Sequence, residues 1–250
     1  MMVALGKFFF RFRGGVSPTL MVLLLIISTP RDFLGDPSLD SWLDAAGALV
    51  VILGLAVRAI TIGYEYIVRG GRKRQVYANR LVQGGVYAHT RNPMYLGNGL
   101  ITLGLAMVVN AWQFYLIGLP FIALMYASII AAEEAFLREK FGAEFDAYCA
   151  RVNRILPRLS GFKDSIEGMR FNWRRVLVKD YGTIYLSIVS VICLDWWHDY
   201  AVRGPSALIT TGHAWLAAFL IGWFVLFLAV RWLKKTRRLE GDRPDQPHPA

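Results

Sequence analysis

The stretch LGNGLITLGLAMVVNAWQFYLIGLPFIALMYASIIAA, residues 96–132, decides the fold predicted for this chain. It is apolar almost throughout, and it is too long for one crossing because a helix spans a bilayer with about 20 residues. The letters VVNAWQ divide it, with a tight turn at Asn110 and Ala111. The stretch therefore predicts two shorter helices that form a hairpin and that begin and end on the same side of the membrane.

Four more apolar segments each predict one membrane-spanning helix: residues 14–29, 42–68, 181–200 and 212–232. Lys7, Arg11 and Arg13 precede the first segment as in a secretory signal, but no small-x-small cleavage site follows it, so we expect an uncleaved span. Of the 250 residues, 55% are hydrophobic and only 18% are charged, which is typical of a polytopic membrane protein. We expect an all-α protein that crosses the membrane about six times.

Lysine and arginine residues indicate the orientation of the chain in the bilayer. The formal net charge is +10, but the basic residues flank apolar segments instead of covering a soluble surface, so we expect no nucleic-acid partner. They gather in three stretches that would share one side of the membrane: Arg69, Arg72, Lys73, Arg74, Arg80 and Arg91; ten residues from Arg138 to Lys179; and Lys234, Lys235, Arg237 and Arg238. The loops on the other side carry just Arg31 and Arg203. The positive-inside rule then predicts that both termini are cytoplasmic. We expect the membrane to be the bacterial inner membrane.

Residues 133–180 have charges of both signs and an apolar stripe at helical spacing. The stripe consists of Leu137, Phe141, Phe145, Tyr148, Val152 and Ile155. We expect a cytoplasmic amphipathic helix that lies against the membrane or folds back onto the hairpin. The polar, Pro-rich residues 240–250 predict a disordered tail, and Cys149 and Cys193 lie in unrelated contexts that favour structural thiols.

Two groups of polar residues stand at the ends of the hairpin, where polar groups are costly and hence candidates for function. The first precedes the hairpin and is held at a turn by Pro93, which restricts the residue before it; it comprises Tyr87, His89, Arg91, Asn92 and Tyr95. The second is Glu133 and Glu134, where the hairpin returns. Adjacent carboxylates repel, so at least one of them needs a cation or a hydroxyl as partner. Because both hairpin ends share one side, we expect the two groups to lie close together.

A third polar group is the pair Arg58 and Glu65 in the second span. They are seven residues apart, so on a helix they would share one side at a separation of about 10 Å, which excludes a direct salt bridge. Arg58 near mid-span should face protein and not lipid. Structural pairing with neighbouring helices is favoured over direct chemistry for both. His198 lies in the sequence DWWHDY between two aspartates, which is not a complete metal site, and we expect no metal.

Each of the hairpin groups also has a purely structural interpretation. Arg91 can simply enforce topology, the tyrosines can be residues of the membrane interface, and Glu133 and Glu134 can be the solvated start of a helix. Residue types alone leave these alternatives open.

Two sequence motifs favour a functional interpretation of these hairpin groups over the structural one. GGVYAHTRNPMYLG, residues 84–97, resembles the G-x-Y-x-x-x-R-H-P-x-Y-x-G signature of the isoprenylcysteine carboxyl methyltransferase and phospholipid N-methyltransferase superfamily. EEAFLREKFGAEFDAYCARVNRILP, residues 133–157, resembles the second motif of that family, E-E-x-x-L-x-x-x-F-G-x-E-Y-x-x-Y-x-x-x-V-x-R-x-x-P. Asn92 stands where the family usually has histidine, and Phe145 where it usually has tyrosine. Asn92 can hydrogen-bond but does not titrate near neutral pH; His89 is a candidate to compensate.

The resemblance implies a membrane-embedded methyltransferase that uses S-adenosyl-L-methionine and a lipophilic acceptor. It implies a cofactor site made of Tyr87, His89, Arg91, Asn92, Pro93, Tyr95, Leu96, Gly97, Glu133 and Glu134. Arg91 suits the cofactor carboxylate, the glutamates suit its ammonium and ribose hydroxyls, and tyrosine rings suit the sulfonium. No covalent nucleophile is required, so the catalytic candidates remain Arg91, Arg58 and Glu65. The acceptor atom, nitrogen, oxygen or sulfur, is not determined.

The chain divides into four predicted parts: residues 1–83 with two spans and a basic linker, 84–159 as the cofactor-binding core, 160–239 as a two-span extension, and 240–250 as the tail. The extension either completes the acceptor pocket or mediates oligomerisation. Polar residues at its start would lie at the rim beside the cofactor: Asn172, Arg174, Arg175 and Asp180. Two alternatives remain: an NADPH-dependent membrane reductase resembling the sterol reductases, whose motif would be R-H-x-N-Y, and a non-catalytic scaffold protein.

Overall fold

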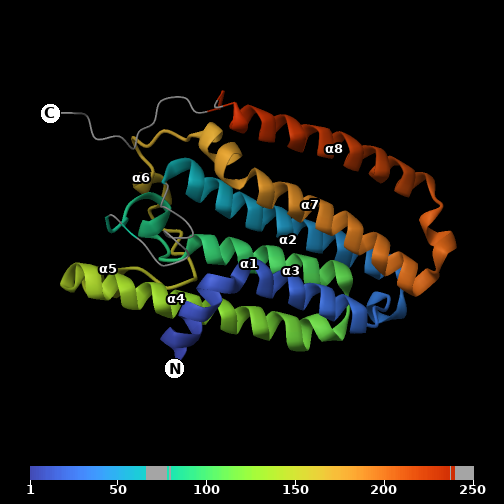
Figure 1. The fold of residues 1–250 in the computed structure, drawn as a ribbon, viewed down its shortest axis with the longest axis horizontal. Coiled ribbons are helices and arrows are strands. Elements are labelled where there is room, and N and C mark those ends of the chain that lie inside the picture. Colours follow the sequence, from blue (N-terminus) through green and yellow to red (C-terminus); the bar gives the residue numbers. More distant parts are fainter. Residues whose placement is uncertain (66–77, 79, 237, 240–250) are drawn as a thin grey trace.

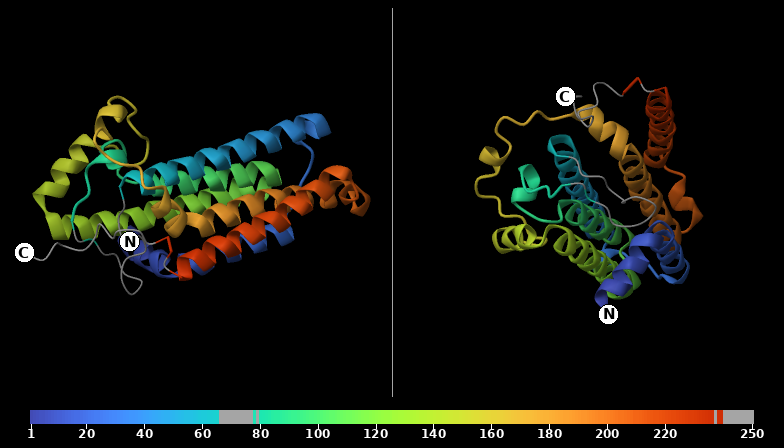
Figure 2. Two further views of the ribbon diagram at one scale, coloured as in Figure 1. Left: turned by 90° about the horizontal axis from the view of Figure 1, so that it is seen from above. Right: turned by 60° about the vertical axis from the view of Figure 1, so that its left-hand side comes forward.

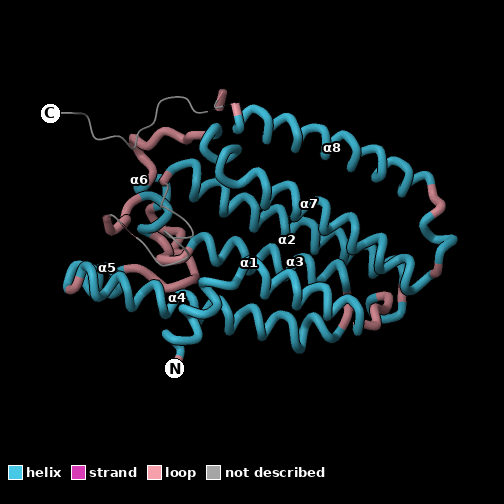
Figure 3. The backbone as a smooth tube through the Cα atoms, in the orientation of Figure 1, coloured by secondary structure: helices cyan, strands magenta, loops and turns pink. Residues whose placement is uncertain are grey.

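The computed structural model describes residues 1–65, 78, 80–236 and 238–239, and these consist of helices and loops without a strand (Figure 3). Eight α-helices follow one another in this part of the chain: α1 (Met2–Ile27), α2 (Pro37–Tyr64), α3 (Pro93–Val109), α4 (Leu119–Phe141), α5 (Ala143–Arg151), α6 (Phe162–Ser165), α7 (Trp173–Arg203) and α8 (Thr211–Lys235). The long helices run side by side, and the short helices α5 and α6 lie at one end of the bundle (Figure 1).

The expected all-α membrane architecture is confirmed. Five helices of the described residues are long and apolar enough to cross a membrane: α1, α2, α7, α8, and α4 together with the π-helical turn Phe114–Gly118 before it. The shorter α3 has 17 residues, or about 26 Å at 1.5 Å per residue, which is close to the thickness of the bilayer core. About six crossings are therefore accommodated, and the start of α1 and the end of α8 lie at the same end of the bundle (Figure 1).

The hairpin forms from α3 and α4, with its turn where the sequence predicts it. Asn110 ends α3 in the left-handed conformation with φ 43°, which Asn adopts more readily than most residues. Its side-chain amide donates to the carbonyl oxygen of Arg31 at 2.8 Å and to Asp40 Oδ1 at 3.2 Å. The hairpin tip is thereby attached to the segment that joins α1 and α2.

Glycines on α2 and α3 bring these two helices into close contact. A Cβ atom on Gly54 would lie 2.6 Å from the carbonyl oxygen of Gly97, and one on Gly47 would lie 2.8 Å from that of Gly104. Both distances are too short for a carbon atom, so only glycine allows the two backbones to approach this far. Small residues at helix contacts are a general means of packing membrane helices, and here they hold the hairpin against the second span.

Several predicted boundaries are wrong by one or more turns. The first helix begins at Met2 instead of residue 14. The second begins at Pro37, where Asp36 caps it by accepting from the backbone N–H of Ser38 at 2.8 Å. It ends at Tyr64, and Glu65 is already extended. Apolar composition marks the part of a helix inside the bilayer, whereas caps decide where the helix itself begins and ends. Residues 66–68 of that span, Arg69, Arg72, Lys73, Arg74, Arg237 and the tail 240–250 lie outside the described residues.

The amphipathic helix expected from the stripe between Leu137 and Ile155 is divided into the end of α4 and the short α5. Glu133 and Glu134 lie within α4, which continues to Phe141, and Gly142 then interrupts the helix with φ 50° and ψ −126°. After the short α5, Val152 is extended and the chain runs irregularly to α6 and α7. A non-glycine residue rarely adopts the Gly142 conformation. The break lets α5 change direction and bury Phe145 and Tyr148 of the predicted stripe.

The last two spans are confirmed as α7 and α8. α8 lies on the outside of the bundle, alongside α7 (Figure 2), with ring contacts such as Tyr185 on Phe227 at 4.3 Å between centroids. None of the most apolar window of α8 is buried within the protein, which suits a helix surrounded by lipid.

Candidate cofactor site

The turn before α3 is tied by hydrogen bonds to the loop after α5. The backbone N–H of Arg91 donates to the carbonyl oxygen of Asn153 at 2.9 Å, and the Thr90 hydroxyl donates to that of Ile155 at 2.8 Å. The side-chain amide of Asn92 donates to the carbonyl oxygen of Arg154 at 2.9 Å. Pro93 occupies the first turn of α3, where its missing N–H costs nothing. The two motifs are therefore joined backbone to backbone.

Glu133 is held by a tyrosine from the other arm of the hairpin. The Tyr95 hydroxyl donates to Glu133 Oε1 at 2.9 Å and accepts from Arg13 Nη1 of α1 at 3.4 Å. The ring of Tyr126 lies 5.4 Å from that of Tyr95. A carboxylate, a phenol and a guanidinium from three helices thus meet at this point.

Glu134 points to the opposite side and pairs with two arginines. Arg154 donates to both of its oxygens, from Nε at 3.1 Å and from Nη2 at 2.7 Å, and Arg91 Nη2 lies 3.4 Å from Oε1. The side chains of Arg91 and Glu134 are 15% and 14% exposed. The expected proximity of the motif to the glutamates is confirmed, and so is the expectation that at least one carboxylate has a cation or a hydroxyl as partner.

His89 and Tyr87 lie on the outer side of this turn. The two ring nitrogens of His89 contact the carbonyl oxygen of Arg158 and the Ser165 hydroxyl, the latter at 2.8 Å, so its imidazole holds the segment around α6. The carbonyl oxygen of Tyr87 accepts from the Tyr148 hydroxyl at 2.7 Å. Burial raises the pKa of Tyr148 well above its usual range, which keeps this phenol protonated as a donor. Of the other predicted site residues, Leu96 is half-buried, and Gly97 is in the contact between α2 and α3.

Arg58 faces protein, as predicted, and it is saturated with partners. Its Nε donates to Asp180 Oδ2 at 3.0 Å and its Nη2 to the Thr183 hydroxyl at 3.1 Å, and it also contacts Asp180 Oδ1 and Asn98 Oδ1. Asp180 therefore does not lie at an exposed rim, since it is buried with Arg58 between α2 and α7. The hydroxyl of Tyr126 interacts with Asn98 and Thr102. A polar region thus continues from Glu133 into the bundle.

Glu65 does not share a helix side with Arg58, because α2 ends one residue before it. Its carboxylate accepts from Arg80 Nη2 at 2.9 Å, and the Arg80 side chain is 76% exposed. The other predicted rim residues secure α7: Asn172 caps that helix by accepting from the backbone N–H of Arg175 at 2.9 Å. The expectation that Arg58 and Glu65 lie two turns apart on one side of a helix is wrong, because Glu65 lies outside α2.

Five residues of this region were not among the predicted site residues. Arg13, Thr90, Asn98 and Arg154 each contact a predicted residue, and Asp180 was assigned only to the rim. Arg154 belongs to the second motif, and Asn98 interrupts an apolar run, so both had a signal in the sequence. Arg13 had none beyond its charge, since contact between α1 and the hairpin depends on how the helices pack.

The donor groups of the site fit a zwitterionic cofactor. Arg91 Nε is buried and has no hydrogen-bond partner among the described residues, and an unpaired buried donor of this kind is costly unless a ligand accepts from it. A carboxylate suits a guanidinium that still has a free N–H. Glu133 accepts from Tyr95, whereas Glu134 is engaged by two arginines, so Glu133 is the candidate partner for an ammonium group.

The fold defines a polytopic helical membrane protein, and a charged candidate site lies at one end of its hairpin. A family model described as phospholipid methyltransferase matches residues 43–144. The nickel-cobalt-cadmium resistance protein NccN of Alcaligenes xylosoxydans xylosoxydans is 32% identical over 161 residues, 64% of this chain and 71% of that protein. The cobalt-zinc-cadmium resistance protein CzcN of Cupriavidus metallidurans is 34% identical over 160 residues, 62% of this chain and 71% of that protein.

Protein-S-isoprenylcysteine O-methyltransferase of Rattus norvegicus is 29% identical over 137 residues, 49% of this chain and 44% of that protein. No solved structure matches the chain. The chain belongs to the isoprenylcysteine carboxyl methyltransferase and phospholipid methyltransferase superfamily, and it is a membrane methyltransferase by that membership. The family favours this activity over the reductase and scaffold alternatives.

Proposed function

We propose that this protein transfers the methyl group of S-adenosyl-L-methionine to a lipophilic acceptor that enters from the bilayer. The observation that carries the proposal is the pairing of Arg91 with Glu134 at 3.4 Å, beside the unpartnered Arg91 Nε. A guanidinium that served only to neutralise Glu134 would not need to keep a buried N–H unsatisfied. The two family motifs meet at this pair, which supports a common ligand.

The residues of the site have distinct roles in this proposal. Arg91 would bind the cofactor carboxylate through Nε, and Arg154 holds Glu134 so that the guanidinium of Arg91 stays in position. Glu133, oriented by Tyr95, would bind the ammonium group or the ribose hydroxyls. When bound, the cofactor would supply a methyl group already activated by its sulfonium, and the acceptor lone pair would take that methyl group as the carbon–sulfur bond breaks. The protein then mainly aligns the two reactants and excludes water.

The interior polar region supports an acceptor that approaches between α2, α3 and α4. Arg58 is a catalytic candidate from the sequence, but its donors are engaged by Asp180, Thr183 and Asn98. We therefore assign Arg58 to positioning Asn98, and we leave Glu65 outside the reaction because it pairs with an exposed arginine. Asp180 belongs to the two-span extension, so residues 160–239 would complete the core formed by 84–159.

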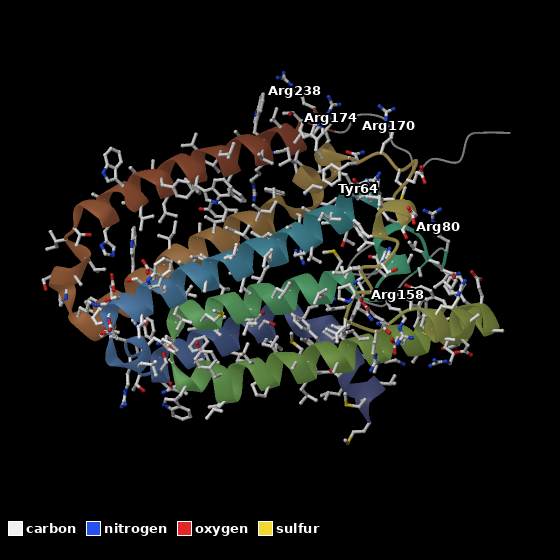
Figure 4. All side chains as sticks on the ribbon, turned by 180° about the vertical axis from the view of Figure 1, so that it is seen from behind. Tyr64, Arg80, Arg158, Arg170, Arg174 and Arg238 are labelled. Carbon is white, nitrogen blue, oxygen red and sulfur yellow. The ribbon has the colours of Figure 1, made fainter. Side chains whose placement is uncertain are left out.

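The proposed orientation has the cofactor site in the cytoplasm, with both termini on that side of the bacterial inner membrane. Arg80, Arg158, Arg170, Arg174 and Arg238 gather at the end of the bundle where the cofactor site lies (Figure 4). Basic residues collect on the cytoplasmic side of membrane proteins, and a polar cofactor would reach the site from there.

A thermal-shift measurement tests the proposal with protein purified in detergent. S-adenosyl-L-methionine and S-adenosyl-L-homocysteine should each raise the melting temperature, because a ligand stabilises the fold that binds it, whereas NADPH should not. Stabilisation by NADPH alone would favour a reductase, and no response to any of the three would favour a scaffold. Lipid extracts incubated with a labelled methyl donor, with and without the protein, would then identify the acceptor class.

A further inference from the structure

A second polar group lies at the opposite end of the bundle from the cofactor site. We call Asp32, Asp40 and His198 the far-end cluster. Asp32 lies in the segment between α1 and α2, Asp40 in the first turn of α2, and His198 near the end of α7. Their ligand atoms all lie within 4.8 Å of one another.

Asp40 is a buried carboxylate with two unequal oxygens. Its residue is 1% exposed. Oδ1 accepts from the backbone N–H of Phe33 at 3.1 Å and from Asn110 Nδ2 at 3.2 Å. Oδ2 faces His198 Nδ1 at 3.5 Å and Arg203 Nη2 at 3.7 Å, and both distances exceed those of ordinary hydrogen bonds. One oxygen of this buried carboxylate is therefore aimed into the cluster, where His198 and Arg203 are its ion-pair partners.

His198 presents its Nδ1 atom to this oxygen. The residue is 2% exposed, and its Nε2 lies 3.3 Å from the carbonyl oxygen of Arg31. A carbonyl oxygen only accepts, so Nε2 carries a hydrogen, and Nδ1 is the ring nitrogen that faces the carboxylate. Histidines that bind metals are commonly fixed in this way, with the other ring N–H donated to a carbonyl or carboxylate oxygen.

We propose that the far-end cluster binds one divalent transition-metal ion through His198 Nδ1, Asp40 Oδ2 and a carboxylate oxygen of Asp32, with water completing the shell. Ligands about 2.1 Å from a tetrahedral ion are about 3.4 Å apart, and the distance from Nδ1 to Oδ2 is 3.5 Å. One imidazole with two carboxylates suits Zn²⁺, Co²⁺ or Ni²⁺ better than Mg²⁺ or Ca²⁺, which prefer oxygen ligands alone.

The surrounding charges favour a cation at this position. Three carboxylates, Asp40, Asp195 and Asp32, and the guanidinium of Arg203 act on nearby Asp44. Arg203 also contacts Asp199 through Nη1 while its Nη2 contacts Asp32. The guanidinium can therefore remain on Asp199 when an ion takes the Asp32 oxygen. The sequence pointed away from this site because the ligands are not the aspartates next to His198 in DWWHDY.

The ion would join α7 of the two-span extension to the segment between α1 and α2. This role does not depend on methyl transfer, since the cluster lies at the end of the bundle opposite the cofactor site. Loss of the ion should loosen the contact of α7 with α2 and leave the cofactor residues in place.

Cobalt binding tests the proposal directly. The full-length protein, freed of any affinity tag and treated with chelator, is titrated with CoCl₂ in detergent, and visible absorption of the ion and a thermal shift are recorded. We expect one ion per chain, a tetrahedral Co²⁺ spectrum, and displacement by ZnCl₂. His198→Ala and Asp32→Asn should each weaken binding by at least about tenfold.

Asp32→Asn serves as the second variant because Asp32 is less buried than His198 and its loss is less disruptive to folding. His213→Ala is the matched control, since His213 lies at the same end of the bundle on α8 and pairs with Asp199; it should leave binding unchanged. Unsaturable binding, equal binding by the variants, or equal stabilisation by MgCl₂ would overturn the proposal.

Discussion

Two arginine–carboxylate pairs in this protein differ in their burial and in how many of the arginine's donors have a partner. Arg58 and Asp180 have 7% and 1% of their side-chain surface exposed, and Asn98 and Thr183 occupy further donors of the guanidinium. Arg91 and Glu134 are 15% and 14% exposed, their contact is 3.4 Å long, and Arg91 Nε remains unpartnered among the described residues. A saturated pair holds helices together, whereas an incompletely satisfied one at the open end of a hairpin is suited to a ligand. The difference fits a structural role for Arg58 and Asp180 and the proposed binding role for Arg91 and Glu134.

Removing one partner of the buried pair should have the largest effect on stability. Asp180→Ala leaves the Arg58 charge buried without its counter-ion and should lower the free energy of unfolding by about 3 to 5 kcal/mol. Denaturation of the purified protein in detergent measures this. Asp146→Ala is the control, because its pair with Arg138 is exposed to solvent and its loss should leave the free energy of unfolding nearly unchanged. The double variant Arg58→Met with Asp180→Leu should recover most of the loss; equal losses in all three proteins would contradict the assigned role.

The glycine beneath Arg58 gives a second way to disturb the same pair. A Cβ on Gly97 would lie 2.6 Å from Arg58 Cγ and 2.8 Å from the carbonyl oxygen of Gly54. Gly97→Ala should therefore separate α2 from α3 and lower stability by about 1 to 3 kcal/mol. Gly99→Ala, where nothing lies within 4 Å of an added Cβ, should be neutral or slightly stabilising in the same denaturation measurement. If Gly97→Ala left the free energy of unfolding unchanged, α2 and α3 would be able to separate at this contact without a loss of stability.

The open pair should control cofactor affinity instead of stability. Arg91→Ala removes a charged donor, and such hydrogen bonds contribute about 1.5 to 3 kcal/mol, so the Kd for S-adenosyl-L-methionine should rise about 10- to 100-fold. Calorimetry in detergent measures the Kd, and the melting temperature without ligand should change little. Arg80→Ala, at an exposed arginine, should leave the Kd unchanged. An unaltered Kd for the Arg91 variant would remove that residue from the site.

The smallest expected effect concerns the residue that departs from the family motif. Asn92→Ala deletes the hydrogen bond from Nδ2 to the carbonyl oxygen of Arg154, a neutral bond that contributes about 0.5 to 1.5 kcal/mol. Because that loop carries Arg154, which holds Glu134, cofactor affinity should fall a few-fold. The pH profile of methyl transfer should not change, since the amide does not titrate. A shifted profile would mean that this turn takes part in proton transfer.

Hydropathy was sufficient to predict the architecture. It did not predict where the helices end or which side chains pair within them. The hairpin turn at Asn110 and the proximity of Glu133 and Glu134 to Arg91 follow from a long apolar run whose two ends must share one side. Glu65 was misjudged because the helix ends at Tyr64, and the amphipathic helix was misjudged because Gly142 adopts φ 50°. Both errors arise from local backbone conformations, which the periodicity of apolar residues does not reveal.

The amino-acid sequence alone determined that this chain is a helical membrane protein, that a hairpin joins its two motifs, and that the residues of the first motif lie near the two glutamates at the hairpin's open end. These features depend on apolar length and on residues close to the hairpin in the chain. The tertiary structure decided that Asp180 neutralises Arg58, that Arg13 of α1 reaches Tyr95, and that Asp32 and Asp40 face His198. Such partners come from separate elements of the fold, and their contacts depend on which helix faces pack together. The shapes of the helix surfaces, as at Gly54 and Gly97, decide that packing, and the local sequence does not.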